Sequence, residues 1–176
     1  MTNATLDNQA QNLRFLCTND QQDIGELVGA FFTISFDSEF DAVPNSVSAM
    51  LSLLESRYDL IVMDCLHGHG DDSLLPAEVA ALFQTIPVFS GSAAGKKRLT
   101  EGERLFRMLR SPEAADLGWK TDVGSVPVVF YTANPSLLDQ DVIGSMPPVS
   151  VIAAPRGLDD LTDEVQRLLG EARSVE

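Results

Sequence analysis

Two unbroken apolar runs, DLIVM at 59–63 and VPVVFYTA at 126–133, limit the folds open to this chain more than any other feature. A strand that is apolar on both faces is buried on both faces, which is typical of the centre of a parallel sheet. Parallel neighbours cannot be joined by a tight turn, so a crossover, usually a helix, must connect them. We therefore expect a parallel sheet with helices on both sides.

The rest of the chain continues this alternation. Shorter apolar runs predict three further strands, at 13–17, 32–36 and 149–153. Between the runs, apolar residues recur at helical spacing, and the last such segment closes the chain. Strands and helices in alternation predict the α/β class, here a doubly wound (βα)5 parallel sheet.

Residues 66–99 are too many for a plain crossover between the third strand and its helix. The expected helix starts only after Thr100, which forms a capping box with Glu103. The extra segment carries a helical apolar stripe of its own: Val79, Leu82, Phe83 and Ile86. We expect this stripe to pack on the domain's own core, with a partner or dimer contact as the alternative. The prediction is one domain over 13–172, with 66–99 inserted between strand 3 and helix 3, after a disordered tail at 1–12.

Composition excludes several classes of protein. The net charge of −14 repels phosphate backbones, so we expect no nucleic-acid binding. There is no apolar stretch long enough to cross a membrane and no signal peptide. The two cysteines, Cys17 and Cys65, fall on predicted buried strands, which suits free thiols in a reducing cytoplasm.

Polar residues follow three of the predicted strands. Asn19 and Asp20 come after the first, Asp64 after the third and Thr132 at the end of the fourth. Ligands of open parallel sheets gather outside the carboxyl ends of the central strands. Each residue alone is explained as a cap or turn residue, but together they predict one site with two carboxylates and a hydroxyl.

These segments resemble the receiver domains of bacterial response regulators, the CheY-like proteins with a flavodoxin-like fold. The resemblance rests on LRFLCTNDQQDIGELV, YDLIVMD, VPVVFYTA and AAPRGLDDLTDEVQRLL. The spacings from Asp20 to Asp64 and from Thr132 to Ala154 are typical of the family. The match covers nearly everything except the tail and 66–99, and it implies the strand order 2-1-3-4-5.

The resemblance implies that Asp64 accepts a phosphoryl group. It also implies that Asp20, Asp64 and the backbone carbonyl of Leu66 hold Mg²⁺, with Asn19 as a weak ligand. The metal offsets repulsion between the carboxylate and the incoming phosphoryl oxygens. Thr132 is expected to hydrogen-bond one of those oxygens.

The expected role is a stand-alone, atypical receiver in a phosphorelay, which is not an enzyme. Because the chain ends soon after the last predicted helix, we expect no attached output domain. The implied partners are a histidine kinase or phosphotransfer protein and a downstream protein target. The sequence leaves a homodimer open.

Three positions depart from the family pattern. Asn19 replaces one acid of the family's pair, Ala154 replaces the lysine after strand five, and Val151 replaces a switching aromatic. Basic residues that could take the place of the lysine are Arg156, Lys96 and Lys97. The alternative is therefore a pseudo-receiver, an interaction module that works without phosphorylation.

A second motif, HGHGDD at 67–72, follows Asp64 directly. His67, His69 and Asp71 resemble part of the ligand signature of metallo-β-lactamase-fold hydrolases, which makes a metal-dependent hydrolase a third alternative. The chain has only two histidines, fewer than that family needs. We interpret the motif as the polar, glycine-rich start of an exposed insertion. The basic GSAAGKKR at 91–98 lacks P-loop spacing and is interpreted as a mobile loop.

Overall fold

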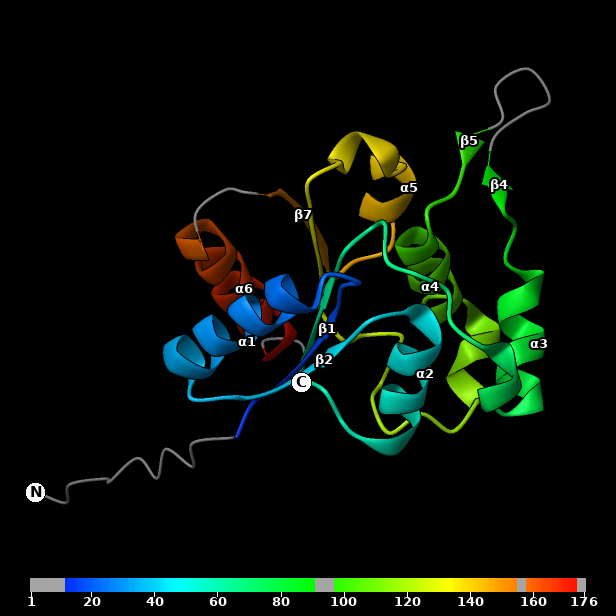
Figure 1. Ribbon diagram of the computed structural model, residues 1–176, viewed down its shortest axis with the longest axis horizontal. Coiled ribbons are helices and arrows are strands. Elements are labelled where there is room, and N and C mark those ends of the chain that lie inside the picture. The colour runs from blue at the N-terminus through cyan, green and yellow to red at the C-terminus, as the bar shows by residue number, and fades with distance from the viewer. Residues whose placement is uncertain (1–11, 91–96, 155–157, 174–176) are drawn as a thin grey trace, which may run out of the picture.

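Five parallel strands form the central sheet of the computed structural model, which describes residues 12–90, 97–154 and 158–173. The order across the sheet is β2-β1-β3-β6-β7 (Figure 1). The strands are β1 (Arg14–Thr18), β2 (Glu39–Val43), β3 (Leu60–Met63), β6 (Val128–Thr132) and β7 (Val149–Ala153). Counted within the sheet, this is the predicted order 2-1-3-4-5, and the doubly wound α/β class is confirmed.

Helices cover both faces of the sheet (Figure 1). The α-helices are α1 (Gln22–Phe36), α2 (Ser46–Glu55), α3 (Ala77–Thr85), α4 (Glu101–Leu109), α5 (Gln140–Gly144) and α6 (Leu158–Arg173). Helices α1 and α6 pack on one face, and α2, α4 and α5 pack on the other, with α3 stacked on α4. No helix in the described part of the chain is long and apolar enough to span a membrane.

The predicted strand at 32–36 is wrong, because these residues form the last turns of α1. Phe32 and Phe36 are four residues apart, so they lie on the same helical face. Their rings meet that of Phe15 on β1, with centroids 5.4 and 5.5 Å apart. The helix ends at Asp37, which has a left-handed φ of 49°. The second strand follows as β2, beside β1.

The inserted segment has structure of its own. It contains the short 3-10 helix η1 (Asp72–Leu74), helix α3 and an antiparallel pair, β4 (Phe89–Ser90) with β5 (Lys97–Arg98). Val79 and Phe83 of α3 are buried in the main core, and Leu82 and Ile86 pack against it. The expectation that the apolar stripe packs on the domain's own core is confirmed. The tail at 1–11, and Lys96 and Arg156, lie outside the described residues.

Candidate functional site

The predicted site residues lie along the carboxyl edge of the sheet. Hydrogen bonds join the ends of neighbouring strands there: Asp64 N donates to Thr18 O at 2.9 Å, and Ala154 N donates to Thr132 O at 2.8 Å. Asn19 N donates to Val43 O at 3.0 Å in the same way. The parallel register therefore brings Asn19, Asp64, Thr132 and Ala154 to one edge.

The two candidate carboxylates differ in exposure. Asp64 is half-buried and Asp20 is exposed. Both lie near the His67 ring: burial lowers the pKa of His67, while the Asp64 and Asp20 carboxylates act to raise it. The Glu101 carboxylate acts on the pKa of His67 in the same direction.

Asn19 has a local structural role. Its side-chain oxygen accepts a hydrogen bond from Gln21 N at 2.8 Å, which forms a turn ahead of α1. An amide performs this role as well as a carboxylate, and it removes one negative charge from the site. One of the two lone pairs of this oxygen is therefore already engaged.

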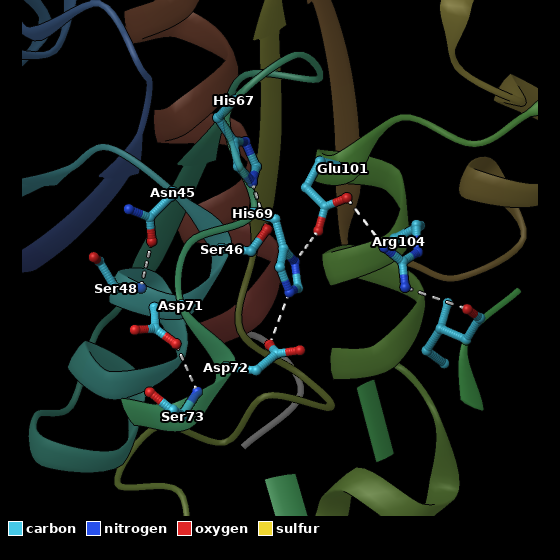
Figure 2. A network of polar contacts seen from close by, with 11 residues as sticks. Asn45, Ser46, Ser48, His67, His69, Asp71, Asp72, Ser73, Glu101 and Arg104 are labelled. Atoms are coloured by element: carbon cyan, nitrogen blue, oxygen red, sulfur yellow. Dashed lines mark hydrogen bonds and ion pairs between the residues drawn. The ribbon is translucent and has the colours of Figure 1, made fainter. Parts of the chain in front are cut away.

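His67 is buried, with 2% of its surface exposed, so the expectation of an exposed start to the insertion is wrong at this residue. Its Nδ1 lies 2.7 Å from the Asp64 carbonyl oxygen. Its Nε2 lies 2.9 Å from Ser46 Oγ (Figure 2). A carbonyl only accepts, so Nδ1 carries the proton and the Ser46 hydroxyl donates to Nε2. Thr18 Oγ1 lies 3.3 Å from Nδ1. A neutral imidazole therefore fixes the peptide that follows Asp64.

The loop after His67 also completes the start of α2. Ser46 N donates to Gly68 O at 3.0 Å, and Val47 N donates to His69 O at 2.9 Å. The first N–H groups of a helix have no acceptor within the helix, and here the loop supplies two carbonyl acceptors for them. Asn45 caps the same helix by accepting from Ser48 N at 2.8 Å (Figure 2).

His69 connects the insertion to α4. Its Nδ1 is 2.6 Å from Glu101 Oε1, and its Nε2 is 2.8 Å from Asp72 Oδ1 (Figure 2). The ring stacks on Phe83 with centroids 5.0 Å apart, and the Arg104 guanidinium lies 4.5 Å from the centroid of that same ring. Both ring nitrogens face a carboxylate oxygen, so the His69 side chain clamps Asp72 and Glu101 together.

His67, His69 and Asp71 do not assemble a metal site. Asp71 caps η1 by accepting from Ser73 N at 3.0 Å, and the two histidines have the separate partners given above. Within 12–90, 97–154 and 158–173, no group of three or more His, Cys, Asp or Glu side chains is placed to hold a metal. The geometry therefore gives no support to the hydrolase alternative.

Thr132 is buried, and its hydroxyl contacts Cys65, a residue that the sequence did not single out for the site. Thr132 Oγ1 lies 2.9 Å from Cys65 Sγ and accepts from Asn134 N at 3.3 Å. Burial raises the pKa of the Cys65 thiol, which keeps the sulfur protonated. Both cysteines are buried and free, as expected.

The start of α4 lies directly against the peptide that follows Asp64. Gly102 N donates to Cys65 O at 3.2 Å. A Cβ at Gly102 would lie 2.4 Å from the Asp64 carbonyl oxygen, closer than real Cβ contacts, so only glycine fits without a shift. The predicted cap is confirmed, because Thr100 Oγ1 accepts from Glu103 N at 3.2 Å. The Glu103 carboxylate, however, pairs with Arg107 at 2.6 Å.

The donor set at this edge fits a hard divalent cation. Asp20 and Asp64 supply carboxylate oxygens, and the Leu66 peptide, one residue beyond Cys65, supplies a carbonyl oxygen. Mg²⁺ prefers oxygen ligands and retains several waters, so two carboxylates and a carbonyl suffice. No lysine follows β7, and Lys97 is engaged elsewhere, with its Nζ donating to Ser136 O at 3.4 Å.

No family model matches the sequence, and no curated protein matches it either. Solved structures do match the fold. The receiver domain of the Francisella response regulator 1452 has a TM-score of 0.59 at 16% identity, covering 91% of this chain and 98% of that one. The receiver domain of the sensor histidine kinase PA1611 from Pseudomonas aeruginosa PAO1, solved with a magnesium ion in its active site cleft, gives 0.56 at 20%, with coverages of 90% and 98%.

Chemotaxis response regulator CheY4 of Vibrio cholerae is also similar, with a TM-score of 0.54 at 13% identity and coverages of 89% and 98%. The fold is therefore that of a response regulator receiver domain, and the predicted CheY-like, flavodoxin-like architecture is confirmed. The particular features of this chain are the inserted segment after β3 and the polar network around His67 and His69.

Proposed function

We propose that this chain is a receiver in a phosphorelay and that it accepts a phosphoryl group on Asp64. The observation that carries the proposal is the position of Asp64. It is half-buried at the end of the central strand β3, within a receiver fold. On the neighbouring strands, Thr132 is the last residue of β6, and Asp20 lies two residues after the end of β1. A nucleophile, a second acid and a hydroxyl at one edge of the sheet support this proposal.

In the proposed reaction, an Asp64 carboxylate oxygen bonds to phosphorus while the bond from phosphorus to its donor breaks. The donor is a phosphohistidine or a small acyl phosphate, and the product is an aspartyl phosphate. The Thr132 hydroxyl donates to a phosphoryl oxygen. Asp20, Asp64 and the Leu66 carbonyl would hold Mg²⁺, and Asn19 contributes weakly. When bound, the cation offsets the charge of the phosphoryl oxygens.

The partners follow from this chemistry. A histidine kinase or a phosphotransfer protein would supply the phosphoryl group, and a downstream protein would read the result by direct contact. The chain would act as a signalling module, not as an enzyme. The two buried free thiols support a cytoplasmic location, and the net charge of −14 argues against nucleic acid as a target.

A phosphorylation-independent pseudo-receiver is the second candidate. It is favoured by Ala154, whose methyl group cannot replace the family's lysine, and by the engaged amide of Asn19. Val151 packs against the main core and offers no switching aromatic. In this case the same fold would present a fixed surface to its partner.

Acetyl phosphate separates the two candidates. The wild type is incubated with Mg²⁺ and acetyl phosphate and then analysed by intact mass and peptide mapping. We expect one added phosphoryl group on Asp64 that hydroxylamine removes, as an acyl phosphate requires. Asp64→Asn should abolish the gain, whereas Asp71→Asn, which removes an exposed acid in the same loop, should retain it. No gain in the wild type would favour the pseudo-receiver.

A further inference from the structure

The Cys65 thiol and the Thr132 hydroxyl form a buried pair at the site. Cys65 follows Asp64 directly, and its Sγ is 2.9 Å from Thr132 Oγ1. The two residues are 0% and 1% exposed, so water does not compete for either group. This contact joins the ends of β3 and β6, the two strands that hold the proposed acceptor and its hydroxyl partner.

The contact allows either group to donate, and we assign the Thr132 hydroxyl as the donor because each of the two groups has a further partner. Asn134 N donates to Thr132 Oγ1, which occupies one of the two acceptor positions of that oxygen. The Cys65 thiol lies 3.9 Å from Asn134 O, an acceptor for the S–H proton. The sulfur lone pairs are then left facing the hydroxyl, and the single Thr132 proton points toward sulfur. In this state, Thr132 has no proton to offer to a phosphoryl oxygen.

We propose that Cys65 is a positioning residue that holds the Thr132 hydroxyl in the unphosphorylated state. The inference rests on the proposed function of Asp64. Phosphorylation requires Thr132 to exchange its hydrogen bond to sulfur for one to the phosphoryl group. Sulfur is a weak acceptor, so the exchange is easy for a thiol and harder for a hydroxyl at the same position.

Substitutions at Cys65 should therefore change the affinity for a phosphoryl mimic in a fixed order. Beryllofluoride binding with Mg²⁺ is measured by ¹⁹F NMR for the wild type, Cys65→Ala and Cys65→Ser. One hydrogen bond gained or lost changes affinity by about threefold. We therefore expect Cys65→Ala to bind beryllofluoride about threefold more tightly than the wild type, and Cys65→Ser about threefold more weakly. Cys17→Ala, which removes the other buried thiol without a contact to Thr132, should leave the affinity unchanged.

A double-mutant cycle tests whether Cys65 acts through Thr132. In a Thr132→Val background, the differences among cysteine, alanine and serine at position 65 should disappear. Differences that persist there would overturn the inference, because a purely structural effect of position 65 does not depend on the hydroxyl. Equal affinities in all three single variants would overturn it as well.

A spectroscopic measurement separates this inference from the proposed function. In Cys17→Ala the only thiol is Cys65, so its S–H stretching band can be read by infrared spectroscopy. Adding Thr132→Val should shift this band if the two groups are hydrogen-bonded, and an unshifted band would refute the pair. A shifted band in a protein that does not bind beryllofluoride would mean that the pair exists while phosphoryl acceptance fails.

Discussion

Single residues around Asp64 show how a receiver-like site is altered without loss of the fold. Asn19 retains the turn ahead of α1 but not the charge, since an amide oxygen accepts from Gln21 N as a carboxylate would. His67 occupies the loop after Asp64 as a buried neutral base. Gly102 lets α4 approach the Asp64 peptide. Each of these residues makes a separate prediction.

Restoring the missing acid should strengthen Mg²⁺ binding. Asn19→Asp keeps an acceptor for Gln21 N and adds one negative charge to a donor set of two carboxylates and a carbonyl. We expect calorimetry to show tighter binding for Asn19→Asp than for the wild type, and nearly none for Asp64→Asn. Unchanged affinity in Asp64→Asn would place the cation elsewhere.

The burial of His67 makes stability depend on pH. Burial lowers the pKa of His67 from its ordinary value of 6.5. Just below pH 6.5, His67 is therefore protonated in the unfolded chain but still neutral in the folded chain. The contribution of His67 to the free energy of unfolding should therefore be fully present above about pH 6.5 and decrease as the pH falls toward its lower folded-state pKa. His67→Gln should lose less stability on acidification than the wild type, in urea titrations with a chelator present. An equal loss in both proteins would assign the effect to other groups.

The contact at Gly102 predicts a steric cost. Gly102→Ala places a Cβ against the Asp64 carbonyl, and overpacking of this kind costs about 1–3 kcal/mol of unfolding free energy. Gly170→Ala is the matched control in α6, because its Cβ meets no atom within 4 Å and the better helix propensity of alanine adds up to about 1 kcal/mol. Chemical denaturation measures both. Equal effects would mean that α4 can move away from Asp64.

At the scale of elements, the insertion is joined to the receiver fold at both of its ends. Its first residues pair with the start of α2, and its end leads through Leu99 into the cap of α4. Between these ends, His69 bridges Asp72 and Glu101 over the ring of Phe83. The segment is therefore part of the domain's own core.

Loss of the His69 clamp should loosen the start of the insertion. In His69→Gln, both carboxylates lose their imidazole partner, and since these side chains are partly exposed we expect a loss of about 1 kcal/mol of unfolding free energy. Hydrogen exchange should speed up over 66–75 and at the start of α4, but not in α6. Asp71→Asn, which alters only the exposed cap of η1, is the control from the same segment and should leave α4 unchanged.

The whole molecule has two cores, one on each side of the sheet. Helices α1 and α6 enclose an aromatic cluster, while α2, α3 and α4 enclose the larger core that includes Cys65. The candidate site at the carboxyl edge contacts the second core through Cys65 and the loop at His67. We therefore expect a structural change at Asp64 to be passed to the insertion through these contacts.

This architecture predicts where a response to phosphorylation will appear. Binding of beryllofluoride should alter hydrogen exchange in the inserted region more than on the β7 face, because Ala154 and Val151 supply neither the lysine nor the aromatic of the usual response. Comparing peptides from 66–90 with those from 149–154, with and without the mimic, measures this. A larger response at β7 would contradict the prediction. No change in either region, despite binding, would mean that the switch is inactive.

The apolar runs by themselves determined four of the five strands and put Asp64 and Thr132 at strand ends, because such runs and their polar ends are local signals. The strand order followed from the resemblance to receiver domains and not from the runs. The sequence pattern misassigned 32–36, since the same apolar residues suit a strand or a helix until Phe15 and Phe40 pack against them. Tertiary structure alone decided that His67 lies inside, that Cys65 contacts Thr132 and that His69 contacts Glu101. These partners are far apart along the chain, and only the parallel crossovers bring them within hydrogen-bond distance.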